Sequence, residues 1–182
     1  MQRIGLGFDA HAFAAPEAGR PLILGGVEVP YERGLLGHSD ADVLTHAIAD
    51  ALLGAARAGD IGTHFPDTDP SYAQANSLDL LARTKEVVCG SGWRIVDVDS
   101  VIVAQAPRLA PYRDEMRARL AQALDVKTDQ IGVKATTTER LGFEGREEGI
   151  SAQAIVLLQQ PGRCNRAEQS EQPKQSGEGC AC

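Results

Sequence analysis

The sequence predicts an α+β fold: a single domain with a mixed β-sheet and helices packed on one face. Three observations favour this class. Short apolar runs rich in β-branched residues alternate with segments whose apolar residues recur at helical spacing. The resulting order, β-β-β-α-α-β-α-β-β, has too few strand–helix–strand units for a doubly wound parallel sheet. The 182 residues are the length of one domain with a tail, and we expect the domain over residues 1–160.

The first strands lie near the N-terminus. Residues 2–8 predict a short strand that ends at Asp9. A β-hairpin is expected next, because the apolar runs 22–24 and 27–29 flank Gly25-Gly26. A Gly-Gly pair suits the positive backbone angles of a two-residue turn.

Three helices are expected. The first begins at Ser39 and Asp42, a helix-capping pattern, and its apolar residues keep helical spacing as far as Ala55. The second covers residues 76–90, where glycines follow the apolar pattern. The third has Pro111 in its first turn, a position that suits proline.

The remaining strands are expected at 95–105, which is rich in β-branched residues, and at 131–136 and 150–159, the closing strands. Residues 161–182 contain no Val, Ile, Leu, Met, Phe, Tyr or Trp. Such a segment buries too little apolar surface to offset its conformational entropy, so we expect a disordered, low-complexity tail. Its Cys-Ala-Cys ending offers only two thiolates, which make a poor metal site on their own.

Composition excludes several classes of function. The formal net charge of −7 disfavours nucleic-acid binding, because phosphate backbones are themselves negative. No uncharged apolar run approaches the roughly 18 residues of a membrane helix, and the N-terminus lacks a secretory pattern. We therefore expect a cytoplasmic protein with no membrane association. The sequence also lacks a P-loop, a G-x-S-x-G elbow and a Rossmann fingerprint.

A metal site is suggested by Asp9, His11 and His46. Asp9 and His11 are two residues apart at a strand end, so they share one face. His46 lies in the first predicted helix in a polar stripe with Asp42 and Asp50. One Asp and two His form a three-ligand set with an open fourth position, as in catalytic Zn²⁺ sites. The alternative is that these side chains are separate surface or hydrogen-bonded groups.

Two further segments suit phosphate. His38-Ser39 stands just before the first predicted helix, where free N–H groups and the helix dipole favour an anion. The alternative is that Ser39 is only a cap. The hydroxyls of 136–138 follow a strand and can donate to phosphate oxygens, and Glu139 offers a hard oxygen ligand for Mg²⁺. The alternative here is a continued strand with a solvated Glu139.

These segments occur together with other strings in a fixed order. The strings are Ile4-Gly5-Leu6-Gly7-Phe8-Asp9-Ala10-His11, Leu24-Gly25-Gly26-Val27, His38-Ser39-Asp40-Ala41-Asp42-Val43, Gly59-Asp60-Ile61-Gly62, Phe65-Pro66-Asp67-Thr68-Asp69, Ala104-Gln105-Ala106-Pro107 and Lys134-Ala135-Thr136-Thr137-Thr138-Glu139 through Gly142-Phe143. Over residues 2–159 the chain closely resembles the 2-C-methyl-D-erythritol 2,4-cyclodiphosphate synthase family of the non-mevalonate isoprenoid pathway.

The resemblance implies a phosphorus–oxygen lyase activity. The expected reaction converts 4-diphosphocytidyl-2-C-methyl-D-erythritol 2-phosphate to 2-C-methyl-D-erythritol 2,4-cyclodiphosphate and releases CMP. It proceeds by metal-assisted intramolecular attack of one phosphate on the β-phosphate. The resemblance also implies a homotrimer whose active sites lie between subunits, with the small cytidine-diphosphate molecule as substrate.

Roles for single residues follow from the same resemblance. Asp9, His11 and His46 would hold Zn²⁺, and Glu139 would hold Mg²⁺ or Mn²⁺ with the substrate diphosphate. His38 and Thr137 would be catalytic, as stabilisers of the transition state. The implied substrate-binding set is Asp9, His11, His38, Ser39, Asp60, Gly62, Phe65, Asp67, Asp69, Ala104, Pro107, Arg108, Leu109, Ala110, Thr136, Thr137, Thr138, Glu139, Phe143 and Arg146. Arg108 departs from the family pattern, in which Lys is common, and its guanidinium has a different hydrogen-bond geometry.

Two other functions remain open at this point. A metal-dependent hydrolase could use the same Asp-His-His set to activate water. A non-catalytic trimer could bind nucleotides or isoprenoid phosphates. The reaction products distinguish the three: a cyclic product with CMP, linear products, or no turnover.

Overall fold

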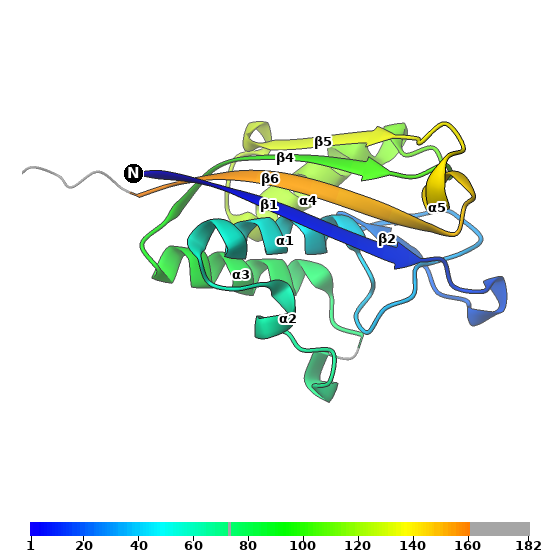
Figure 1. The fold of residues 1–182 in the computed structure, drawn as a ribbon, viewed down its shortest axis with the longest axis horizontal. Helices are drawn as coiled ribbons and strands as arrows, with labels where there is room; N and C mark the ends of the chain where they lie inside the picture. The colour runs from blue at the N-terminus through cyan, green and yellow to red at the C-terminus, as the bar shows by residue number, and fades with distance from the viewer. Residues whose placement is uncertain (73, 161–182) are drawn as a thin grey trace, which may run out of the picture.

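The computed structural model describes residues 1–72 and 74–160, and the expected tail lies outside them. The main sheet has four strands in the order β1-β6-β4-β5 (Figure 1). The strands are β1 (Gln2–Ala12), β6 (Gly149–Gln159), β4 (Arg94–Val103) and β5 (Ile131–Thr136). The pairs β1–β6 and β6–β4 are antiparallel, whereas β4–β5 is parallel. The predicted mixed sheet is confirmed.

A separate two-stranded hairpin consists of β2 (Leu22–Leu24) and β3 (Val27–Val29). Gly25 and Gly26 have φ angles of 57° and 73°. Both values lie in the left-handed region that glycine adopts without a steric penalty, as a two-residue turn of the primed type requires. The hairpin predicted from the Gly-Gly pair is therefore confirmed.

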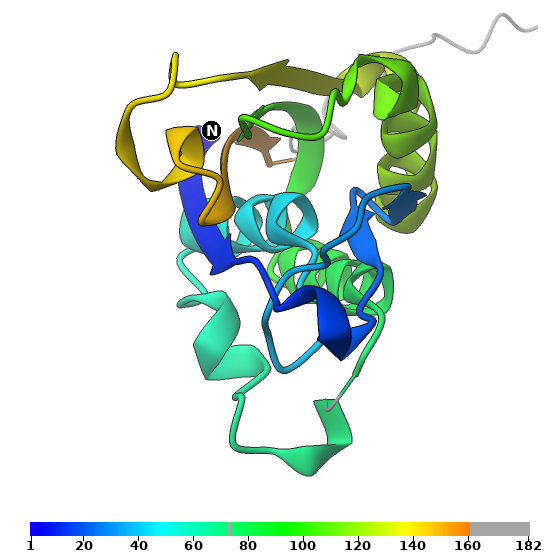
Figure 2. The same ribbon diagram turned by 90° about the vertical axis from the view of Figure 1, so that its right-hand side faces the viewer.

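Three helices cover one face of the main sheet, as predicted: α1 (Val43–Ala56), α3 (Ser77–Gly90) and α4 (Arg113–Leu124). Helix α1 lies directly under β1 and β6, and α4 lies beside β5. Helix α3 packs on α1 and α4, farther from the sheet (Figures 1 and 2). None of the helices in the described part of the chain is long and apolar enough to span a bilayer.

Short elements fill the connections. Two are one-turn helices, α2 (Ile61–His64) and α5 (Gly142–Gly145). The others are 3₁₀ turns: η1 (Pro16–Ala18), η2 (Pro70–Tyr72), η3 (Ala110–Tyr112) and η4 (Thr128–Gln130). Pro111 lies in η3, immediately before α4, so its predicted place at the start of the third helix is confirmed to within one turn.

The closest backbone contact in the core joins β1 to α1. A Cβ placed on Gly7 would lie 2.0 Å from the carbonyl oxygen of Ala47, and one on Gly5 would lie 2.0 Å from that of Ala51. The strand therefore rests directly on the helix backbone, between small side chains. This contact fixes where the side chain of His46 meets the end of β1.

The other face of β1 is uncovered in the single chain. Ile4, Leu6 and Phe8 are 66%, 66% and 56% exposed, and Ile155 of the neighbouring strand β6 is 52% exposed. The four apolar side chains share one side of the sheet, because residues two apart along a strand point the same way. An apolar patch of this kind marks a surface that meets a partner.

Strand β1 is longer than predicted. It does not end at Asp9 but continues to Ala12, and Asp9 and His11 pair with Ala152 and Ile150 of β6. The apolar pattern of the sequence stops at Phe8, whereas the backbone ladder with β6 does not depend on apolar side chains. Asp9 and His11 therefore share one face as expected, but within the strand.

Helix α1 begins later than predicted, at Val43, so His38-Ser39 does not adjoin its N-terminus. The cap is Asp42, whose fully buried carboxylate accepts from Thr45 N and Thr45 Oγ1 and from the N–H groups of Gly25 and Gly26. Burial raises the pKa of Asp42, while the hydrogen bonds from Thr45 and Gly26 oppose this shift. The expected anion site at this helix end is thus occupied by the carboxylate of the chain itself.

We expect Gly7→Ala to lower the free energy of unfolding by about 3 kcal/mol, because the added methyl group would push the backbone of α1 away from β1. Gly54→Ala is the matched control within α1. Nothing lies within 4 Å of a Cβ at Gly54, so helix propensity should raise stability by about 0.5–1 kcal/mol. Urea unfolding followed by circular dichroism measures both. Wild-type stability in Gly7→Ala would contradict the close contact.

Candidate active site

Three side chains converge where β1 meets α1. Asp9 Oδ2 lies 3.0 Å from His11 Nε2 and 3.0 Å from His46 Nδ1, and the two nitrogens are 3.2 Å apart. A tetrahedral ion with bonds of about 2.0–2.1 Å separates its ligand atoms by about 3.3–3.4 Å. The observed spacing is close to this value. The predicted trio is therefore brought together in a geometry that could hold a divalent metal.

Charges inside this cluster are strongly coupled. Burial opposes ionisation of Asp9, but hydrogen bonds from His11 and His46 outweigh it and hold the pKa of the carboxyl well below its usual range. Burial also disfavours the charged ring of His11. The hydrogen bond to Asp9 and its negative charge outweigh that effect and raise the pKa of His11 above 6.5. Because the pKa of His11 is raised, protons compete with a metal for this ligand.

A cavity of about 450 Å³ opens beside the cluster. Its wall includes His11 and His46 together with five residues of the predicted substrate-binding set or their neighbours: His38, Ser39, Gly62, Phe65 and Asp67. The ring of Phe65 meets Tyr72 edge to face at 5.5 Å between centroids. His38 Nε2 lies 3.2 Å from the backbone carbonyl of Asp69. We call this space the metal-side cavity.

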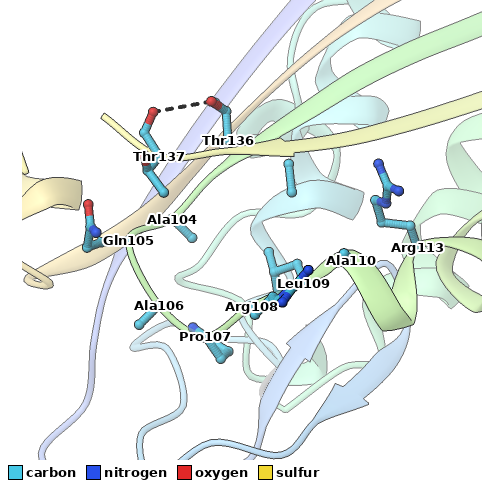
Figure 3. A pocket seen from close by; sticks show the side chains of 11 residues that line it. Ala104, Gln105, Ala106, Pro107, Arg108, Leu109, Ala110, Arg113, Thr136 and Thr137 are labelled. Atoms are coloured by element: carbon cyan, nitrogen blue, oxygen red, sulfur yellow. Dashed lines mark hydrogen bonds between the residues drawn. The ribbon is translucent and has the colours of Figure 1, made fainter. Parts of the chain in front are cut away.

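A second cavity of about 340 Å³ lies at the carboxyl ends of the parallel strands β4 and β5 (Figure 3). It is lined by the 104–110 loop, Arg113 and residues 135–137. The loop leaves β4 and enters α4, so the β4–α4–β5 crossover brings both segments to one sheet edge, the usual place for ligands in such units. We call this space the strand-end cavity. Predicted residues Ala104, Pro107, Arg108, Leu109, Ala110, Thr136 and Thr137 all line it.

Figure 3 shows how the strand-end cavity is formed. The 104–110 loop curves past the ends of the strands, opposite Thr136 and Thr137. Thr136 Oγ1 donates to the backbone carbonyl of Thr137. Arg108 and Arg113 supply guanidinium groups. Hydroxyls and cations on opposite walls suit a phosphorylated ligand.

Other predicted residues do not line either cavity in the described single chain: Asp9, Asp60, Asp69, Thr138, Glu139, Phe143 and Arg146. The Asp60 carboxylate caps α2 by accepting from Thr63 N at 2.8 Å. Thr137 Oγ1 donates to Glu139 Oε1 at 3.0 Å, and Arg146 pairs with Glu148 at 2.8 Å. The predicted second metal ligand is therefore not joined to the Asp9 cluster within one chain.

Sequence reasoning missed several lining residues. Ile61, Tyr72 and Leu80 line the metal-side cavity, and Arg113 lines the strand-end cavity. Ser77 is also missed, although its Oγ lies 2.9 Å from His46 Nε2. The sequence marks this position only as the start of a helix. Arg113 was accessible to prediction, since a cation directly after a proline-bounded loop suits a phosphate site.

Comparison with known proteins decides the family. The model of the YgbB family matches residues 2–159. This chain belongs to the YgbB family. The match covers the residues that form the sheet, its helices and both cavities.

Relatives of this YgbB-family chain have informative names. It is 60% identical over 159 residues to the 2-C-methyl-D-erythritol 2,4-cyclodiphosphate synthase of Geobacillus kaustophilus (strain HTA426), which covers 87% of this chain and 99% of that protein. The bifunctional IspDF of Campylobacter jejuni matches with a TM-score of 0.82 and 43% identity, over 87% of this chain and 42% of its own. A CDP complex of IspF from Plasmodium falciparum matches with a TM-score of 0.75 and 33% identity, over 86% and 95% of the two chains. The resemblance expected from the sequence is confirmed.

We expect His46→Ala to lose its bound metal, because two ligands remain where three converge. Zinc content by elemental analysis should fall from about one ion per chain to well below half. His64→Ala is the matched control, since His64 lies outside the cluster and faces the Ala58 carbonyl at 2.8 Å.

The affinity for zinc should also depend on pH. The raised pKa of His11 means that protons compete with the metal from above pH 6.5, so affinity should fall as the pH drops through that range. Full zinc content in His46→Ala, or an affinity independent of pH, would remove the cluster as the metal site.

Proposed function

We propose that this YgbB-family chain converts 4-diphosphocytidyl-2-C-methyl-D-erythritol 2-phosphate to 2-C-methyl-D-erythritol 2,4-cyclodiphosphate with release of CMP, a phosphorus–oxygen lyase reaction. The carrying observation is the Asp9, His11 and His46 cluster, whose two histidines line an open cavity. The name of the 60% identical relative and the CDP complex of a solved relative support the substrate class. The sequence-based expectation of a cytoplasmic location stays a prediction.

The proposed reaction needs no ionisable side chain of the protein as nucleophile or general base. The attacking group is a phosphate oxygen of the substrate, which is already anionic at neutral pH. The difficulty is the repulsion between one phosphate and another, and cations held by the protein would supply the charge that offsets it. Asp9, His11 and His46 would hold Zn²⁺. Glu139 would hold Mg²⁺ or Mn²⁺, since a single carboxylate leaves the other positions to phosphate oxygens and water.

The remaining polar groups would orient the substrate. The hydroxyl of Thr137 lies within hydrogen-bond distance of Glu139, so both side chains lie close together at the end of β5. A hydroxyl donor there can stabilise charge that grows on a phosphate oxygen. Arg108 and Arg113 would bind phosphate, and the 104–110 loop would receive the cytidine portion. His38 would contact the reacting phosphates from the metal-side cavity.

We also propose a homotrimer with active sites between subunits. Two observations support assembly. The metal-side and strand-end cavities have no lining residue in common within one described chain, which is consistent with a site that two chains would complete. The face of β1 with Ile4, Leu6 and Phe8 is exposed and apolar, as expected of a surface that packs against another subunit.

Incubation with the cytidine-diphosphate substrate and Mg²⁺, followed by phosphorus NMR, tests the activity. We expect a cyclic diphosphate and one CMP for each substrate consumed. Linear phosphates would favour a metal-dependent hydrolase acting through the same cluster, and an unchanged substrate would favour a nucleotide-binding protein. Zinc-depleted enzyme is the control, and it should not turn over.

Thr137→Val and Glu139→Gln should have different defects. Thr137→Val nearly preserves shape but removes one donor, so kcat should fall by roughly 10²-fold with little change in KM. Glu139→Gln removes the charge that holds the second cation, so high Mg²⁺ or Mn²⁺ should partly restore its activity. Steady-state kinetics across a metal titration compares them. Equal rescue of both variants, or of neither, would contradict the assigned roles, and melting temperatures taken in the same buffers identify any loss that comes from stability alone.

A further inference from the structure

His46 is the first of three residues in a chain of hydrogen bonds that runs away from the metal cluster. Its Nε2 atom lies 2.9 Å from Ser77 Oγ, while Nδ1 faces Asp9. Ser77 Oγ in turn donates to Asp40 Oδ1. Ser77 is 1% exposed and is the first residue of α3. The chain of contacts thus joins α1, the start of α3 and the segment before α1.

The two carboxylate oxygens of Asp40 are acceptors, and they determine where the hydroxyl proton of Ser77 points. Oδ2 accepts from Ser77 N at 3.0 Å, and Oδ1 accepts from Asp42 N at 3.3 Å as well as from Ser77 Oγ. Asp40 therefore accepts through both of its oxygens. The hydroxyl proton of Ser77 is therefore committed to Asp40. Its oxygen can then only accept from His46.

The consequence for His46 is a single tautomer. If Ser77 Oγ accepts, Nε2 carries a proton. When a metal displaces the proton that Nδ1 shares with Asp9, the ring therefore keeps its proton on Nε2, and the Nδ1 lone pair faces the ion. That lone pair is the one a metal needs. Ser39 Oγ also lies near Nε2, at 3.1 Å, and it accepts from Ala41 N, which leaves its second lone pair free to accept from Nε2 as well. Ser77 is the nearer of the two and, unlike Ser39, is tied to a carboxylate.

We propose that Ser77 and Asp40 are positioning residues for the metal centre, which hold His46 with its proton on Nε2 and its Nδ1 lone pair aimed at the ion. The inference rests on the proposed metal site. Neither residue lines the metal-side cavity, and the Ser77 proton points away from the imidazole, so Ser77 is not a nucleophile. The negative charge of Asp40, passed through a hydroxyl, makes His46 a stronger donor to the metal.

The test measures affinity for Zn²⁺ alone, by competition with a chelating dye. We expect Ser77→Ala and Asp40→Asn to weaken binding by about 10- to 100-fold, the usual cost of losing a partner behind a metal ligand. The amide of Asp40→Asn would present its NH₂ group to one of the two Ser77 donors. The chain of hydrogen bonds from His46 through Ser77 to residue 40 would therefore be broken. The matched controls are Ser91→Ala and Asp79→Asn. Both residues are exposed, Asp79 in the first turn of α3 and Ser91 just after its end, and we expect wild-type affinity from them.

A second measurement uses the zinc-loaded wild-type protein. Nitrogen-15 NMR of labelled histidine should find the His46 proton on Nε2. Zn²⁺ affinity within about threefold of wild type in either variant overturns the proposal, as does a His46 ring protonated on Nδ1. If a variant does not fold, the wild-type tautomer decides. No substrate is present in either experiment, so failure of the proposed cyclisation leaves these results unaffected.

Discussion

The contact between the glycine-bearing strand β1 and the backbone of α1 is the constraint on which the rest of the site depends. Gly7 lies against the Ala47 carbonyl with no room for a side chain, and the next residue of the helix toward its N-terminus is His46. The strand, two residues farther on, supplies Asp9 and then His11. A separation larger by even one methyl group would move the imidazole of His46 away from the other two ligands. Packing and chemistry are therefore specified by the same few residues.

Much of the fold was predictable because its signals are local. The Gly25-Gly26 hairpin, the start of α3 and the three late strands follow from turn chemistry, capping and β-branched runs. The start of α1 was mispredicted because Ser39 and Asp42 both resemble caps. Asp42 becomes the cap through two donors in a hairpin turn 16 and 17 residues away, and no local pattern contains that information.

The candidate site likewise contains some residues that the sequence could predict and others that it could not. Asp9, His11 and His46 could be identified from strand and helix spacing together with the family resemblance, and they do meet. Ser77 could not, because its contact with His46 depends on how α3 packs on α1. The 104–110 loop and Thr137 share a cavity because β4 and β5 are parallel, a relation that the order of elements suggests. In the proposed trimer, the distance from that cavity to the Asp9 cluster would depend on how the chains pack, which no local pattern in the sequence specifies.

The buried carboxylate of Asp42 has a wider consequence for how this fold handles phosphate. Many phosphate-binding proteins use the permanent positive end of a long helix, a charge that is always present and cannot be removed. Here that end of α1 is neutralised internally by Asp42. Attraction for a phosphorylated ligand must then come from other charges: the guanidinium groups of Arg108 and Arg113 and, in the proposed function, exchangeable divalent ions. A protein organised in this way ties its substrate recognition to the ion supply of its surroundings.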